Sequence, residues 1–405
     1  MAGIILREKP EGAGLIRRMA EDSAFEVSGD SDAEQTALLC AADIRGPARP
    51  AKVPKLCLAG HCVFNCAYCG LRASREDKAP YALEPRELAR IAVEQAERSG
   101  RGVFISSAIL KNADYTQERL AETARIMREE LFYGGYLHAK VMPGADPALI
   151  ARTGRYASRL SVNIEVANSA GYQRVAKQKS RELILSPMRS ISGQIREARE
   201  ENRLFARTQT TQLMAGAIGE DDRTIMTLSQ ALYRTYGLRR VYYTAFGYAH
   251  EAKGYPELPL ARTPLWRVTR LYQADRLIAA YGFSPDDVTP ASAAMLEEDI
   301  DPKAAWALRH LDLYPVEINA ADFETLLRVP GIGLTYARRI LEARRYCLIT
   351  HELLRKLRVS LKRCAPFITC GGRYQGGRQL DSPNLRAALS SDPKKASISK
   401  TVCEN

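Results

Sequence analysis

The feature that most limits the fold of this chain is a regular alternation of apolar strand-like segments and amphipathic helix-like segments between residues 53 and 280. Strands are predicted at residues 53–59, 102–107, 135–142, 158–166, 209–215 and 240–246. Helices are predicted at residues 84–99, 116–131, 193–204 and 221–236. Because such alternation builds parallel βαβ units, the sequence predicts an α/β fold with a doubly wound sheet or a barrel.

Polar residues recur on one face of several predicted strands. Ser161, Asn163 and Glu165 alternate with apolar residues, and Gln212 does so in a later strand. Parallel strands that are buried on both faces usually read as continuous apolar runs. A wide or incompletely closed barrel with a polar lumen explains the pattern. An ordinary sheet with a few hydrogen-bonded polar residues is the alternative.

Three cysteines, Cys62, Cys66 and Cys69, lie within eight residues directly after the first predicted strand. Three thiolates on one short loop suit a soft metal centre. Zinc would need a fourth ligand of the usual kind, and no Cys-x2-Cys or His-x3-His pair follows downstream. An iron–sulfur cluster accepts three cysteines if its fourth iron takes a different ligand. The residues favour such a cluster, with structural zinc as the alternative.

The spacing Cys-x3-Cys-x2-Cys, with Tyr68 directly before the last cysteine, resembles the signature of the radical S-adenosylmethionine (radical SAM) superfamily. The resemblance implies that Cys62, Cys66 and Cys69 hold a [4Fe-4S] cluster whose open iron is chelated by SAM. One electron would then cleave SAM to methionine and a 5′-deoxyadenosyl radical, which abstracts a hydrogen atom. It further implies a partial (βα)6 barrel, with its active site at the carboxyl ends of the strands, and an electron donor such as flavodoxin or ferredoxin.

The same resemblance implies positions for SAM contacts. Besides Tyr68, these are Ser106, Ser107, Asn163, Glu165 and Gly216. The two serines stand where the family usually has a glycine-rich motif, which is a departure from its pattern. Three further residues on predicted strands are candidates to face the substrate or act on it, namely Lys140, Gln212 and Tyr243. Each is alternatively a hydrogen-bonded polar residue of the barrel.

A second motif lies near the C-terminus. Asn319 is predicted to cap a helix over residues 323–329, and a second helix follows the turn Pro330-Gly-Ile-Gly333. Gly331 and Gly333 permit positive φ angles and a close approach of the backbone, and Arg338 and Arg339 add charge to the second helix. The pattern resembles a helix-hairpin-helix, a module that binds nucleic-acid phosphates. A hairpin used only for packing is the alternative.

The charge is concentrated at the same end of the chain. The net charge is +12, and residues 303–405 hold 18 Lys and Arg but 9 Asp and Glu. Such asymmetry predicts a polyanionic partner, although a solvated basic surface would give the same composition. No apolar run reaches the ~18 residues that a membrane helix needs, and the N-terminus lacks a secretory pattern. We therefore expect a cytoplasmic protein without a membrane partner.

Together the two motifs resemble a narrower bacterial family of radical SAM proteins described as DNA modification or repair proteins and linked to a uracil-DNA-glycosylase-like protein. The resemblance implies nucleic acid as a partner, with DNA favoured over RNA, and the glycosylase-like protein as a second partner. The alternatives are an RNA-modifying radical SAM enzyme and a non-catalytic iron–sulfur partner of a glycosylase.

The expected domain order combines these segments. It is an N-terminal extension at 1–50, a radical SAM partial barrel at 51–285, a helical linker at 286–316, a small all-α helix-hairpin-helix domain at 317–368 and a mobile tail at 369–405.

Overall fold

The computed structural model describes residues 13–24, 53–74, 80–100, 102–247, 262–377 and 383–390. The chain divides into two compact units, which are described separately below. The sheet unit comprises residues 1–220 and 231–263, and the C-terminal unit comprises residues 221–230 and 264–405. Within the expected N-terminal extension the structure has α1 (Ala13–Ala24), and residues 25–50 lie outside the described part. No helix among the described residues is long and apolar enough to cross a bilayer.

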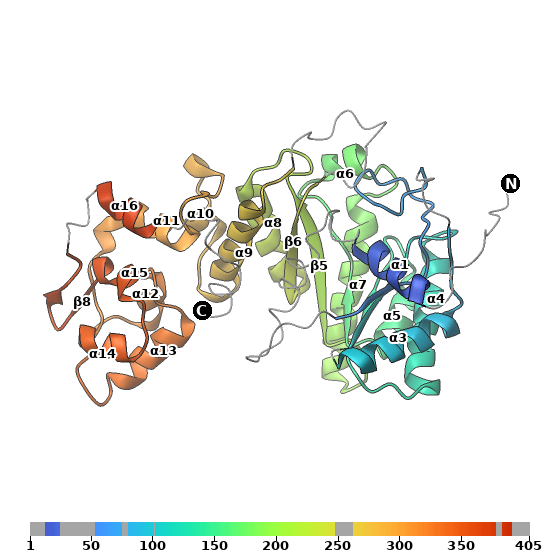
Figure 1. The fold of residues 1–405 in the computed structure, drawn as a ribbon, viewed down its shortest axis with the longest axis horizontal. Helices are drawn as coiled ribbons and strands as arrows, with labels where there is room; N and C mark the ends of the chain where they lie inside the picture. The colour runs from blue at the N-terminus through green and yellow to red at the C-terminus, as the bar shows by residue number, and fades with distance from the viewer. Residues whose placement is uncertain are drawn as a thin grey trace. The chain divides into compact units, whose positions relative to one another are not determined.

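A six-stranded parallel sheet forms the centre of the sheet unit (Figure 1). Its strands follow the order of the chain: β1 (Lys55–Cys57), β2 (Val103–Ser106), β3 (Leu137–Lys140), β4 (Arg159–Ser161), β5 (Thr208–Ala215) and β6 (Arg240–Ala245). All neighbours in the sheet are parallel. Alternate residues such as Ile105, Leu137 and Ala139 are completely buried and form the core. The predicted α/β fold with six parallel strands is confirmed.

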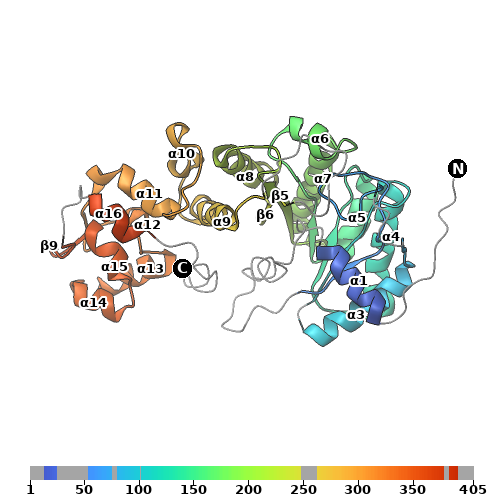
Figure 2. The same ribbon diagram turned by 45° about the horizontal axis from the view of Figure 1, so that its top comes forward.

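Helices connect the strands of this sheet. They are α3 (Pro85–Ser99), α4 (Ala113–Arg125) with the π-helical turn η2 (Ile126–Glu130), α5 (Pro147–Tyr156), α6 (Ser169–Val175), α7 (Arg181–Glu200) and α8 (Asp222–Tyr236). Helices α3, α4, α5 and α7 pack one against the next, as Figures 1 and 2 show. The first helix, α1, packs against strand β1.

Helix α7 is longer than the predicted helix at 193–204, because it continues through Pro187. A proline has no N–H to donate to the carbonyl four residues earlier. In this structure that carbonyl, of Leu183, accepts a hydrogen bond from the N–H of Gly144 at 2.8 Å. Ser180 caps the start of the helix through the N–H of Leu183. The neighbouring loop therefore replaces the missing helical bond.

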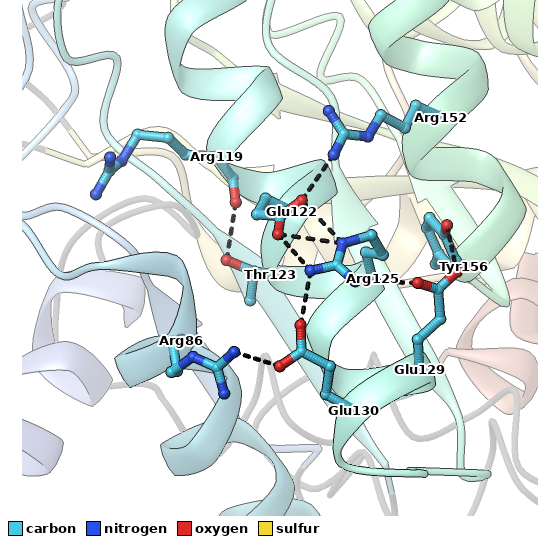
Figure 3. Close-up of polar contacts among 9 residues, drawn as sticks. All are labelled: Arg86, Arg119, Glu122, Thr123, Arg125, Glu129, Glu130, Arg152 and Tyr156. Atoms are coloured by element: carbon cyan, nitrogen blue, oxygen red, sulfur yellow. Dashed lines mark hydrogen bonds and ion pairs between the residues drawn. The ribbon is translucent and has the colours of Figure 1, made fainter.

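An ionic cluster joins the outer surfaces of α3, α4 and α5 (Figure 3). Arg125 lies at its centre and pairs with Glu122 at 2.6 Å, Glu129 at 3.0 Å and Glu130 at 2.7 Å. The cluster extends to Arg86 of α3 and to Arg152 of α5. Because surface ion pairs contribute mainly as networks, we assign these charges to holding the outer helices together.

The C-terminal unit is mainly helical. Its elements are α9 (Leu265–Ala280), α10 (Pro285–Val288), the 3-10 turn η3 (Ala291–Ala293), α11 (Pro302–Arg309), the 3-10 turn η4 (Leu311–Leu313), β7 (Val316–Glu317), α12 (Phe323–Arg328), α13 (Leu334–Ala343), α14 (His351–Lys356), α15 (Leu361–Cys364), the 3-10 turn η5 (Ala365–Phe367), β8 (Ile368–Cys370), β9 (Arg373–Tyr374) and α16 (Pro383–Leu389). Helix α9 was expected in the barrel segment 51–285. It instead belongs to this unit, because it packs against α10 and α11.

A small sheet of β7, β8 and β9 departs from the expected all-α domain. Strand β8 pairs parallel with β7 and antiparallel with β9. The Glu317 carboxylate accepts hydrogen bonds from Asn319, from the Thr369 hydroxyl and from the N–H groups of Gly371 and Gly372. These contacts tie residues beyond 368 to the domain. The end of β8, strand β9 and helix α16 lie within 369–405, where we expected a mobile tail; residues 378–382 and 391–405 are outside the described part.

Candidate functional site

The loop after β1 carries the three cysteines, and its backbone is fixed at several points. The N–H of Cys62 donates to the carbonyl of Leu71, which closes the loop on itself. The N–H of Val63 donates to Ile109 in the loop after β2, and that of Ala67 donates to Val175 at the end of α6. Each of these distances is 2.8 Å. The sequence Cys62–Cys69 is thus held by the connections that follow β2 and β4.

All three thiols line one pocket, at the carboxyl ends of the first four strands. The sulfur of Cys62 accepts the N–H groups of Phe64 at 3.3 Å and Ile109 at 3.4 Å, and the sulfur of Cys69 accepts that of Leu71 at 3.4 Å. Backbone N–H groups directed at sulfur stabilise a thiolate. Among the described residues no three Cys, His, Asp or Glu side chains are grouped for a single metal ion. In a four-iron cluster, by contrast, each thiolate ligates a different iron.

Glu165 enters the same pocket from an irregular end of β4. The regular strand ends at Ser161, and the hydroxyl of Thr211 then bonds to both Ile164 N–H and Val162 C=O. Glu165 adopts a φ of 63°, a left-handed conformation that few residues other than glycine take. Its N–H and C=O are fixed by Gln212 and Met214 of β5. This strained backbone directs the carboxylate to the pocket that the cysteines line.

Lys179 pairs with Glu165 and was not a candidate in the sequence analysis. Its Nζ lies 2.9 Å from the Glu165 carboxylate and 2.9 Å from the Tyr68 hydroxyl. Burial opposes the charge of Lys179, but the Glu165 carboxylate together with the Cys66 and Cys69 sulfurs outweighs burial and raises the pKa of Lys179 above its ordinary value. Burial raises the pKa of the Cys66 and Cys69 thiols, and the Lys179 ammonium opposes that rise. A buried positive charge therefore faces two of the three sulfur atoms.

Most of the predicted site residues meet in this pocket. Those that line it are Cys62, Cys66, Tyr68, Cys69, Ser107, Lys140, Asn163 and Glu165. They come from the loops after β1 and β2 and from the ends of β3 and β4. The donor set of three thiols, two lysines and one carboxylate fits an anionic cluster with polar groups beside it. Lys179 could be found from the sequence only by knowing that α6 ends near the cysteine loop.

Four predicted site residues do not line the pocket. Ser106 is the last residue of β2 and is completely buried. Gly216 has a positive φ of 84°, and its N–H donates to the Glu220 carboxylate. Gln212 is on β5 beyond the pocket lining.

Tyr243 lies on strand β6. It is in register with Leu213, whereas its neighbour Tyr242 is in register with Gln212. Side chains alternate between the faces of a strand, so Tyr242 shares the face of Gln212. Tyr243 is completely buried on the opposite face, so the structure does not place this candidate on the face of Gln212.

A second candidate site is the turn between α12 and α13. Gly331 has a φ of 85°, and a Cβ at this position would lie 2.9 Å from the Arg363 Cβ. Gly333 instead has a φ of −100° and serves as the N-cap of α13, without a side chain to bond the first N–H groups. The cap of α12 is Asp322, through the N–H of Thr325. Asn319, predicted as that cap, instead bonds Glu317 and Ile349.

The arginines near this turn differ in their surroundings. Arg338 and Arg339 are exposed on α13. Arg344 is turned inward and donates to the carbonyls of Ile318 and Ala321, and Arg363 pairs with Asp301. The charge available on α13 is therefore mainly that of Arg338 and Arg339.

The chain matches no protein-family model and no curated protein. Among solved structures it is similar to the FeFe-hydrogenase maturase HydG from Carboxydothermus hydrogenoformans, at 13% identity and a TM-score of 0.42, over 65% of this chain and 62% of that one. It is also similar to TsrM from Kitasatospora setae, a radical S-adenosylmethionine methyltransferase with cobalamin and a [4Fe-4S] cluster bound, at 11% identity and a TM-score of 0.34, over 49% of this chain and 39% of that one. The chain spans less than two thirds of the length of each. We infer function from the chain's own residues.

Proposed function

We propose that the cysteine pocket holds a [4Fe-4S] cluster and SAM, and that the protein is a radical SAM enzyme. The observation that carries the proposal is the meeting of Cys62, Cys66 and Cys69 in one pocket at the carboxyl ends of parallel strands. Sites in such folds lie at these ends. When bound and reduced, the cluster supplies the electron that cleaves SAM to methionine and a 5′-deoxyadenosyl radical.

The protein's own residues have three tasks in this proposal. The three cysteines bind iron, and the backbone N–H groups at Cys62 and Cys69 stabilise their thiolates. Lys179 offsets negative charge beside them and keeps Glu165 ionised. Lys140, Asn163 and Ser107 offer polar groups in the same pocket, which suit the amino and carboxylate groups of SAM. A flavodoxin or ferredoxin is the reductant we propose.

Cluster binding is tested by anaerobic reconstitution with iron and sulfide. We expect about four irons per chain by the cluster's stoichiometry, and an electron paramagnetic resonance signal that changes when SAM is added to the reduced protein. Cys347, which is exposed and outside the pocket, provides the matched control. Cys347→Ala should keep the signal, and Cys66→Ala should lose it. Full iron loading of Cys66→Ala would overturn the ligand assignment.

We further propose that the α12–α13 turn binds nucleic-acid phosphates and that the substrate is DNA. The support is the glycine turn, the uncapped start of α13 and the exposed Arg338 and Arg339 beside it. Unpaired N–H groups and the helix dipole at such a start attract phosphate. Phosphate contacts position a protein without reading the base sequence.

Competition between duplex DNA and a structured RNA tests this second proposal. Arg338→Gln with Arg339→Gln should weaken binding and reduce the slope of log affinity against log salt by about two. Arg189→Gln with Arg196→Gln removes the same charge from exposed positions of α7 and serves as the control. Stronger binding of RNA would move the substrate to RNA. No binding of either would leave a radical SAM enzyme that acts on a different substrate.

A further inference from the structure

A buried lysine lies behind the α12–α13 turn. Lys303 of α11 is 9% exposed, and its Nζ donates a hydrogen bond to the carbonyl of Ile332, the middle residue of the turn. The ammonium also lies 5.1 Å from the centre of the Tyr281 ring. Among the described residues Ile332 is the hydrogen-bond acceptor of this Nζ, although an ammonium has three protons to donate. Burying an ammonium with so few hydrogen-bond partners costs free energy. A compensating negative charge is therefore needed to keep Lys303 in its charged form.

The hydrogen bond from Lys303 sets the direction of the next N–H group. The peptide bond between Ile332 and Gly333 is trans, because the one cis bond among the described residues is Tyr314–Pro315. In a trans peptide the C=O and the following N–H point in opposite directions. With the Ile332 carbonyl held toward Lys303, the N–H of Gly333, a buried residue, points away from Lys303. That N–H is one of the donors that the start of a helix leaves free.

The opposite side of the turn rests on α15. Gly331 lies so close to Arg363 and Ser360 that a Cβ would be 2.9 Å from the Arg363 Cβ and 3.3 Å from the Ser360 carbonyl. Arg363 in turn pairs with Asp301, the N-cap of α11. The turn thus lies between α11 and α15, and the Lys303 ammonium of α11 contacts its inner side.

The surroundings of Lys303 are poor in negative charge. The groups that act electrostatically on its ammonium are Asp301, Arg363, Arg328, Cys364 and the ring of Tyr281. Asp301 is already paired with Arg363. Burial disfavours the charged form of Lys303, and the positive charges of Arg363 and Arg328 act in the same direction. Asp301 opposes them, and the net effect lowers the pKa of Lys303 to about 7. A phosphate on the outer side of the turn would supply the missing negative charge.

We infer that Lys303 is a positioning residue for the turn, and that phosphate binding there is coupled to the uptake of a proton by Lys303. The inference rests on the proposed binding of nucleic acid at this turn. A bound phosphate favours the charged lysine, so by linkage the charged lysine favours bound phosphate. Affinity therefore falls as the pH rises through 7.

Binding of a fluorescent duplex DNA to the full chain, by anisotropy at pH 6.0 and 8.5 and constant salt, tests this coupling. The wild type should lose about tenfold in affinity over this range, which is the loss expected from a coupling of about 1.4 kcal/mol between the proton on Lys303 and the phosphate. Lys303→Met should bind the duplex more weakly than the wild type at pH 6.0, and its affinity should fall much less when the pH is raised to 8.5. Lys362→Met removes the same charge from an exposed position of α15 and should keep the wild-type pH dependence.

A second measurement separates this inference from the proposed function. Hydrogen exchange of residues 329–336 in the free protein, corrected for the intrinsic pH effect, should become faster from pH 6.0 to 8.5 in the wild type and not in Lys303→Met. If circular dichroism shows that Lys303→Met is unfolded, Lys303→Arg replaces it. The charge of Lys303→Arg is permanent, so its corrected exchange rates should not change between pH 6.0 and 8.5. Identical pH dependence in wild type and variant would overturn the role of Lys303. If neither the wild type nor any variant bound DNA or RNA, the proposed binding of nucleic acid would be overturned. The exchange data would still test whether Lys303 positions the turn.

Discussion

Lys179 connects the cysteine loop to the end of β4, because its ammonium bonds both Tyr68 and Glu165. Replacing it with methionine leaves the Glu165 carboxylate buried without this partner. We expect Lys179→Met to lower the free energy of unfolding by about 3 kcal/mol and to reduce the iron retained after reconstitution. Chemical unfolding and iron analysis provide the measurements.

Two further variants control this experiment. Lys177 is exposed two residues away, and Lys177→Met should behave like the wild type. Adding Glu165→Gln to Lys179→Met removes the unpaired charge and should recover most of the lost stability, as coupled neighbours do. Equal stability of Lys179→Met and Lys177→Met would contradict the role assigned to the pair.

Residues differ in how far their sequence context predicts their place. The three cysteines could be predicted to meet because eight residues of one loop carry them all. Lys179 could not, since it reaches the site from a connection between two helices. For Tyr242 and Tyr243 the sequence offers two adjacent tyrosines on one strand. The register with β5, a tertiary property, decides which of them shares the face of Gln212.

Among the elements, the α12–α13 turn depends on Gly331 in two ways. Its φ of 85° is strained for other residues, and an added Cβ would meet Arg363. We expect Gly331→Ala to destabilise the C-terminal unit by about 2 kcal/mol and to weaken DNA binding. Gly282 has a φ of 74° with open space around its Cβ position, so Gly282→Ala measures backbone strain alone. A thermal shift of equal size in the two variants would show that contact with Arg363 has no effect.

The β7–β8–β9 sheet depends on the ionised form of Glu317. Burial acts to raise its pKa, but hydrogen bonds from Gly372, Asn319 and Gly371 outweigh burial and lower it to about 2. A carboxyl group with a lowered pKa stabilises the fold above its unfolded pKa of about 4.5, and this contribution is lost as the pH falls toward 2. Glu317→Gln should cost about 2 kcal/mol at pH 6 and progressively less as the pH falls from 4.5 toward 2.

Urea unfolding at pH 6 and pH 3 measures this difference. Glu324→Gln, at an exposed position of α12, is the control and should unfold like the wild type. If Glu317→Gln lost the same stability at both pH values, the ionised carboxylate would not be what holds the sheet.

Sequence patterns predicted the large sheet better than the small one. Each strand from β1 to β6 falls within or next to a predicted segment, because buried parallel strands are apolar and separated by helices. Strands β7 to β9 are two or three residues long, and hydrogen bonds to one carboxylate tie them together. A period of two cannot be recognised over so few residues. Helix α7 was predicted too short, since the compensation for Pro187 comes from the distant Gly144.

At the scale of the whole molecule, the proposal assigns chemistry to the sheet unit and substrate binding to the C-terminal unit. The two activities should then separate by mutation. Arg338→Gln with Arg339→Gln should leave slow SAM cleavage without nucleic acid unchanged and lose most of the stimulation that DNA gives the wild type. Product assays with and without duplex DNA check this. Equal stimulation of wild type and variant would remove the α12–α13 turn from substrate binding.

The central claim is that Cys62, Cys66 and Cys69 support radical cleavage of SAM. The most direct measurement is the yield of 5′-deoxyadenosine from reconstituted, dithionite-reduced protein with SAM under anaerobic conditions. We predict product from the wild type and from Cys347→Ala, and none from Cys66→Ala that remains folded by circular dichroism. A wild type that carries its cluster and binds SAM yet forms no 5′-deoxyadenosine, with or without DNA or RNA, would contradict the account.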